Sequence, residues 1–342
     1  TDRMLNLLLA APLEDAVWAL VDRLAPADQE QYWRRTNRRA VDLPIESKSR
    51  LLRELLAVQR AQTAFQHLYR EAEKIPTKTI VEVLRTTAFE PAEENAPKIS
   101  WYEVEKCFEV LDERTDCSAN DLAVLEYAFA YALDDSKRGL KALTKVLSIS
   151  PEMFVVGISA IYRDVRIPRD ETGEIDPGAR QRAELWHRIF SKISYGPGGS
   201  ETGEVNLKVF DEWMAKTITL LEESGRLDSG LHTLGDIIGR TRVEVEGQWP
   251  PRDYAMTLEK RGHEELIKGI YYGVVNSRGA HWRDGNGGAA ERSLAQKYRR
   301  WSETCIVDFP KLAACFEGIA RSYEHDAEWH DERARLERTS NQ

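Results

Sequence analysis

GHEELIKGIYYGVVNSRGAHWRDGNGGAAERSLAQKYRRW, residues 262–301, contains two helical patterns joined by a loop, and it decides the fold that we expect. In the first pattern, apolar side chains recur at the spacing that lines one face of a helix. They are Leu266, Ile267, Ile270, Tyr271 and Val274. A stripe this broad must pack on other helices rather than face water, so the stretch predicts a helix packed among helices.

The loop between these two patterns is unusual in composition. Asn276 and Gly279 tolerate the left-handed backbone that ends helices, and further glycines follow. Polar and aromatic side chains crowd into the same loop, namely Asn276, Arg278, His281, Trp282 and Asp284. Loops held between packed helices are common places for binding sites, so these residues form a candidate ligand-binding site. In the competing interpretation, Trp282 fills the gap between the helices while the charged groups cap helix ends.

Prolines and capping residues mark helix starts along the rest of the chain. Pro151 and Pro177 each follow a capping residue, and residues 100–103 and 118–121 match the capping-box type of helix start. The amphipathic runs between such marks predict about sixteen helices joined mostly by short loops. We therefore expect an all-α fold of stacked antiparallel helical hairpins that form an elongated, α-solenoid-like array, although no strict repeat period is visible.

A segment rich in Pro and Glu, residues 90–98, has the composition of a linker. It divides the chain into N-terminal helical hairpins, residues 1–96, and a C-terminal helical array, residues 97–342, unless the two form one continuous domain. The sequence begins without Met, directly in an apolar helical pattern that includes Met4, Leu7 and Leu8. We expect from this that the chain is a piece of a longer polypeptide.

Composition narrows the classes of function. The 342 residues carry a formal net charge of −9, which argues against a binder that attracts nucleic acid over its whole surface. No apolar run reaches the roughly 20 residues that cross a bilayer, and no signal peptide is recognisable, so we expect a cytoplasmic protein without a membrane partner. The 4 cysteines fit neither a zinc nor a redox motif, and we expect them to be buried apolar residues.

Familiar catalytic and metal-binding motifs are incomplete. His263 opens a zincin-like pattern, but Ile267 stands where the second histidine is needed. Residues 195–200 are Gly-rich but lack the Gly-Lys-Ser/Thr ending of a phosphate-binding loop, and Ala295 replaces the glutamate that completes a calcium loop. We therefore assign no catalytic residue, no metal site and no cofactor, and an enzyme is the less favoured interpretation.

A basic cluster offers an alternative function. Arg34, Arg35, Arg38 and Arg39 share one side of a helix beside Tyr32 and Trp33, and a second cluster occupies residues 297–301. The arginines could contact phosphates, or an acidic partner, while the aromatic rings stack on bases. The other interpretation is a solvated basic face whose aromatic side chains point inward.

Three stretches look familiar together: LEYAFAYALDDSKRGLKALTKVLSISPEMFVVGISAIYR at 125–163, residues 222–239 with Trp249 and Pro250 beyond them, and residues 269–301. They resemble the C-terminal helical-repeat region of large bacterial multidomain proteins, some of them similar to signal-transducing NTPases or antiphage-defence proteins. The resemblance covers roughly the last two-thirds of the chain and brings no catalytic residues with it. It implies a non-catalytic scaffold or sensor module that recognises another protein or another part of its parent chain. A ligand-binding or enzymatic domain, and nucleic-acid binding, remain the alternatives.

Overall fold

The computed structural model describes residues 2–37, 43–91, 98–167, 176–244, 247–277 and 288–340. These residues form 17 α-helices and one 3-10 helix, and within them the only β contact is an isolated bridge between Gly199 and Val205. The predicted all-α class is therefore confirmed. None of the described helices is by itself long and apolar enough to span a bilayer. The pair α9 (Lys141–Ile149) and α10 (Pro151–Ile161), bent by 105°, matches a broken span in length and composition.

The chain forms two compact units, Thr1–Leu143 and Thr144–Gln342. The division falls inside α9, whereas the boundary expected from sequence, between residues 96 and 97, lies within the first unit. Residues 92–97 around that expected boundary lie outside the described part of the chain, and the boundary stays a prediction.

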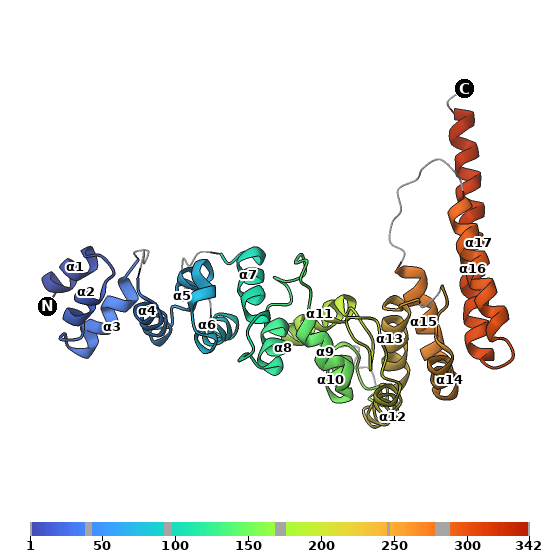
Figure 1. Ribbon diagram of the computed structural model, residues 1–342, viewed down its shortest axis with the longest axis horizontal. Helices are drawn as coiled ribbons and strands as arrows, with labels where there is room; N and C mark the ends of the chain where they lie inside the picture. The colour runs from blue at the N-terminus through green and yellow to red at the C-terminus, as the bar shows by residue number, and fades with distance from the viewer. Residues whose placement is uncertain are drawn as a thin grey trace. The chain divides into compact units, whose positions relative to one another are not determined.

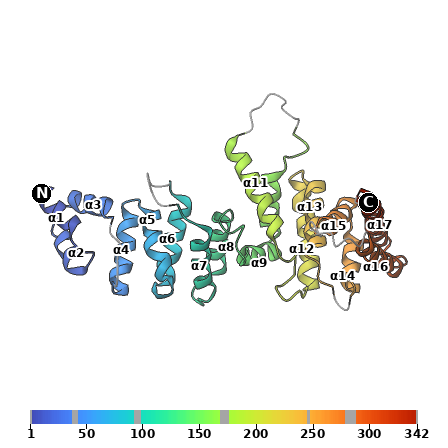
Figure 2. The same cartoon turned by 90° about the horizontal axis from the view of Figure 1, so that it is seen from above.

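In the first unit, α1 packs on α3, α5 packs on α4 and α6, and α6 packs on α8. Figures 1 and 2 show α4, α5 and α6 side by side. Aromatic side chains fill its core, with Trp18, Tyr32, Phe65 and Phe108 fully buried. The helices are α1 (Asp2–Ala10), α2 (Asp15–Val21), α3 (Pro26–Arg35), α4 (Ile45–Ala57), α5 (Ala61–Leu68), the 3-10 helix η1 (Tyr69–Lys74), α6 (Thr77–Phe89), α7 (Trp101–Asp112), α8 (Ala119–Ala128) and the start of α9 (Lys141–Ile149).

The second unit ends in an antiparallel hairpin, α16 and α17, whose shared core contains Tyr298, Trp301 and Phe316. Its helices after α9 are α10 (Pro151–Ile161), α11 (Pro177–Lys192), α12 (Leu207–Glu223), α13 (Leu227–Arg240), α14 (Arg252–Arg261), α15 (Glu264–Asn276), α16 (Ala289–Cys305) and α17 (Pro310–Ser340). The broad apolar stripe that we identified in residues 262–301 is the buried face of α15, where Leu266, Ile270 and Val274 are inaccessible to solvent.

Most predicted helix boundaries are confirmed. The Ser100 hydroxyl accepts from the Glu103 amide while the Glu103 carboxylate accepts from the Ser100 amide, a complete capping box at the start of α7. Gly225 ends α12 with φ of 63°, in the left-handed region. α8, which Ser118 caps, ends at Ala128, and the apolar Phe129 and Leu133 are buried in the turns that follow.

Helices α13 and α15 approach so closely that their backbones touch. Gly235 and Gly239 of α13 face Gly269 and Gly273 of α15, and the contacts advance in the same direction along both helices, which are therefore parallel. A Cβ atom added at Gly235 would lie 2.1 Å from the carbonyl oxygen of Leu266. Because a Cβ atom cannot come so near an oxygen, only glycine fits at this seam.

Candidate functional site

Of the loop residues expected to form a ligand site, the structure describes Asn276 alone. It is the last residue of α15 and its side chain is exposed. Arg278, His281, Trp282 and Asp284 lie outside the described residues, so the loop site remains a prediction.

Asn276 does line a polar pocket of about 390 Å³ in the second unit. Its walls come from α10, α11, α13 and α15, and its polar lining includes Tyr162, His187, His232, Asp236 and Arg240. Sequence inspection did not bring these residues together, because they are scattered over more than a hundred positions and no local spacing links them.

Arg240 and His232, which line this pocket, already make hydrogen bonds or charge contacts with other residues. Arg240 donates to the carbonyl oxygens of Phe190, at 2.7 Å, and Ser191, at 2.8 Å, and so caps the end of α11. Burial lowers the pKa of the Arg240 guanidinium, and Asp236 lies 3.7 Å from it. His232 Nδ1 lies 3.5 Å from a Glu265 carboxylate oxygen. These contacts join α11, α13 and α15 around the pocket.

The predicted basic patch is only partly described. Arg34 pairs with Glu30 at 2.8 Å and Arg35 donates to the Asn6 side chain at 3.1 Å, while Arg38 and Arg39 lie outside the described residues. Tyr32 and Trp33 are buried. The rings are thus packed inward, as the alternative interpretation expected, and cannot stack on nucleic-acid bases as they stand.

The second basic cluster, residues 297–301, also has paired cations and buried aromatic rings. Lys297 pairs with Glu244 and Arg299 pairs with Glu324 at 2.6 Å, while Tyr298 and Trp301 are buried between α16 and α17. Acidic neighbours therefore compensate the two cations, which lowers the positive potential that this cluster could offer to phosphates.

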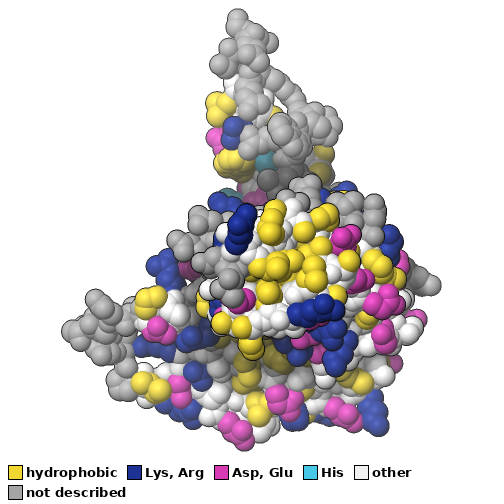
Figure 3. Space-filling model, turned by 90° about the vertical axis from the view of Figure 1, so that its left-hand side faces the viewer, with side chains coloured by type: hydrophobic (Ala, Val, Ile, Leu, Met, Phe, Trp, Pro, Cys, Tyr) yellow, Lys and Arg dark blue, Asp and Glu magenta, His cyan; other side chains and the backbone are white. Residues whose placement is uncertain are grey.

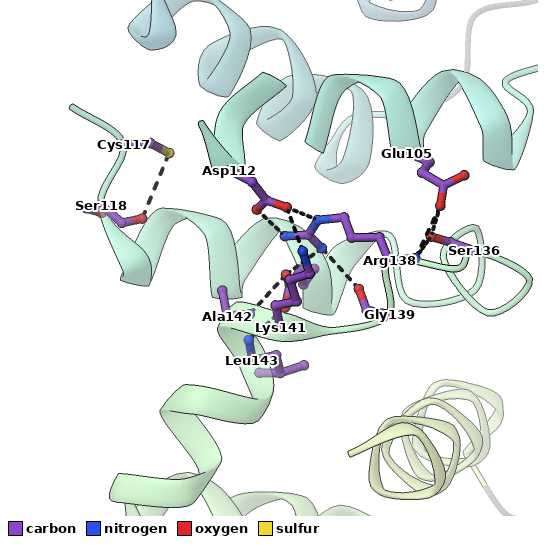
Figure 4. Close-up of polar contacts among 11 residues, drawn as sticks. Glu105, Asp112, Cys117, Ser118, Ser136, Arg138, Gly139, Lys141, Ala142 and Leu143 are labelled. Atoms are coloured by element: carbon purple, nitrogen blue, oxygen red, sulfur yellow. Dashed lines mark hydrogen bonds and ion pairs between the residues drawn. The ribbon is translucent and has the colours of Figure 1, made fainter. Parts of the chain in front are cut away.

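A buried ionic cluster joins α7, α8 and α9 in the first unit (Figure 4). Arg138 places its guanidinium 2.7 Å from Glu126 and 2.6 Å from Asp112, and its face covers the Phe108 ring. Glu126 also accepts from the amides of Ala142, at 3.1 Å, and Leu143, at 2.7 Å, in the first turn of α9. The cluster thus caps α9 and fixes it to the two preceding helices.

The chemistry of this cluster is structural. Burial raises the pKa of the Glu126 carboxyl above its usual value, against the opposing effect of Arg138. Both side chains are almost inaccessible, with exposed fractions of 0% for Glu126 and 3% for Arg138, so neither can reach a substrate from its present position.

Reactive groups elsewhere are buried or dispersed. Cys107, Cys305 and Cys315 are buried as expected, whereas Cys117 is partly exposed, and burial raises the pKa of the Cys107 and Cys315 thiols to about 12. Thiols with so high a pKa stay protonated and are poor nucleophiles. Within the described ranges, no three His, Cys, Asp or Glu residues lie close enough to hold a metal ion.

Three exposed apolar side chains lie near the N-terminus, Met4 and Leu7 on α1 and Leu20 on α2. These side chains have exposed fractions of 53%, 63% and 48%. Figure 3 views the protein from this side, and hydrophobic side chains gather there on the face nearest the viewer, with both basic and acidic side chains around them. We call Met4, Leu7 and Leu20 the N-terminal apolar face.

The sequence contains a signal for this face that we did not use. Leu5 and Leu8 of α1 are buried against the first unit, whereas Met4 and Leu7 point away from it. A helix with one packed side needs only one apolar stripe, so the additional apolar side chains of residues 4–9 indicate a second contact.

The charged side chains beside the N-terminal apolar face differ in whether they already have a partner. Arg3 and Arg23 are exposed and pair with no acidic side chain in the described part of the chain, whereas Asp22 is already paired with Arg50 at 2.5 Å. Asp15 accepts a hydrogen bond from Ser47 at 2.6 Å. Arg3 and Arg23 are therefore accessible cations at this edge, and Glu14, before α2, is an exposed carboxylate near them in the sequence.

Comparison of the chain with protein-family models, with characterised proteins and with solved structures gave no match. The resemblance to bacterial multidomain proteins accordingly stays an expectation.

Proposed function

We propose that this protein is a non-catalytic helical scaffold or sensor module that recognises another protein. The exposed N-terminal apolar face supports this proposal, because exposed apolar side chains that gather on one face commonly mark interaction sites. In this proposal the helices stack as an α-solenoid-like array of hairpins, and the module works in the cytoplasm as part of a larger bacterial signalling or antiphage-defence protein.

The chemistry of the face suggests which kind of partner fits. Met4 and Leu7 lie about one turn apart on α1, and Leu20 is an exposed apolar side chain of α2. Such a surface suits the apolar side of an amphipathic helix. Because Arg3 and Arg23 lack acidic partners among the described residues, a helix with Asp and Glu at its edges complements the face better than a basic one.

Two designed peptides test this recognition directly. Both form amphipathic helices with the same leucine face, one edged with glutamate and the other with lysine, and each carries a fluorophore for anisotropy titration. We expect the acidic peptide to bind the whole chain at least about tenfold more tightly, which is about 1.4 kcal/mol. Equal affinities for the two peptides, or no binding of either, would overturn the proposed partner chemistry.

Two variants show where the peptide binds. Leu7→Asp places a charge in the centre of the N-terminal apolar face and should weaken the acidic peptide at least about tenfold. Trp101→Ala removes another exposed apolar side chain of the first unit, with an exposed fraction of 44%, and should leave the affinity unchanged. Loss of binding in Trp101→Ala but not in Leu7→Asp would move the site to α7 and reject the assignment.

Sedimentation velocity separates a foreign partner from a second copy of this chain. We expect a monomer at concentrations at which the acidic peptide is bound. A dimer that Leu7→Asp dissociates would show that the face serves self-association, and the proposed recognition of another protein would fail.

The alternatives from sequence have weaker support. Nucleic-acid binding would have to proceed without the rings of Tyr32 and Trp33, which are buried, and with Arg34 already paired to Glu30. It predicts that affinity for single-stranded nucleic acid falls steeply with salt. A ligand site around Asn276 rests on a pocket whose charged groups are engaged with one another.

A further inference from the structure

We draw no further inference here: the strongest candidate, the pocket of about 760 Å³ that residues 195–207 line together with the start of α14, carries balanced charges, its Arg242 guanidinium is bonded to Gly239 and Ser277 outside the lining, and the helix starts beside it do not by themselves make a ligand site.

Discussion

The two units hold their helices together in opposite ways. In the first unit, α7, α8 and α9 meet around buried charges, with Arg138 between Glu126 and Asp112. In the second unit, α13 and α15 meet with almost no side chains between them, because glycines line both helices at the contact. The charged cluster is stable only when each ion keeps its partner of opposite charge. The glycine seam is stable only when no side chain is added between the two backbones.

This difference determines which substitutions each unit can tolerate. A buried charge is stable only while its partner remains, so removal of one partner costs more than removal of both. Backbone contact leaves no flexible side chain to move aside, so the addition of one methyl group must separate the helices. Three predictions test this contrast, ordered from the largest expected effect to the smallest.

Arg138→Met should cause the largest loss, about 3–5 kcal/mol of unfolding free energy, because it leaves the Glu126 carboxylate buried without its cation. Urea unfolding followed by circular dichroism measures the loss. Arg138→Met combined with Glu126→Gln should recover part of it, since the second change removes the unpaired charge.

Arg85→Met is the matched control for that substitution. Arg85 pairs with Asp121 at 2.6 Å on the surface of the same unit, where both side chains are largely exposed. Exposed pairs contribute at most about 1 kcal/mol. A loss in Arg138→Met as small as that in Arg85→Met would show that the buried cluster does not hold α7, α8 and α9 together.

Gly235→Ala should cost about 3 kcal/mol, at the upper end of the range for overpacking, because its Cβ would lie 2.1 Å from the Leu266 oxygen. The midpoint of urea unfolding measures the change. Gly318→Ala in α17 is the control, since the nearest atom to its Cβ is 3.7 Å away. Alanine favours helices over glycine by about 1 kcal/mol, so this control should be neutral or stabilising. Similar losses in both variants would contradict backbone contact at the seam.

Asp331→Asn should have the smallest effect, and one that depends on pH. Hydrogen bonds from the Arg292 side chain and then from the Gly288 amide lower the pKa of Asp331 to about 2, from an ordinary value of 3.8. Because this pKa is lowered in the folded state, the stabilisation is present above the ordinary value and is lost as pH falls toward 2. The difference in melting temperature between the wild type and Asp331→Asn should therefore shrink between about pH 5 and about pH 2. A difference that stays constant over this range would remove Asp331 from the link between α16 and α17.

Local chemistry made the helix boundaries predictable, because caps and stops depend on residues within one turn. Ser100 and Pro151 mark the starts of α7 and α10, as their sequence context indicated. Contacts distant in the sequence were not predictable in this way. The Arg138 to Glu126 pair needs a turn after Ala128 that periodicity did not show, and the Gly235 to Gly269 contact joins helices separated by α14.

In the candidate sites too, local features were visible in the sequence, whereas contacts between distant residues were not. Asn276 was recognised at a helix end, but the pocket that it lines is assembled from four helices. Met4 and Leu7 were recognised as apolar, yet sequence alone did not show which apolar residues of α1 would find an internal partner. The Gly-rich residues 195–200 were excluded as a phosphate-binding loop, and only the folded chain shows that they line a pocket together with residues of α13 and α14.

The glycine seam also has a mechanical consequence. Where bulky side chains separate two helices, a change of rotamer lets one helix slide or roll against the other. Between Gly235 and Gly269 the two backbones are in direct contact, so rolling or sliding of α13 against α15 brings backbone atoms into collision. A displacement of α15 at Asn276 is therefore transmitted to α13 through direct backbone contacts rather than through the repacking of side chains.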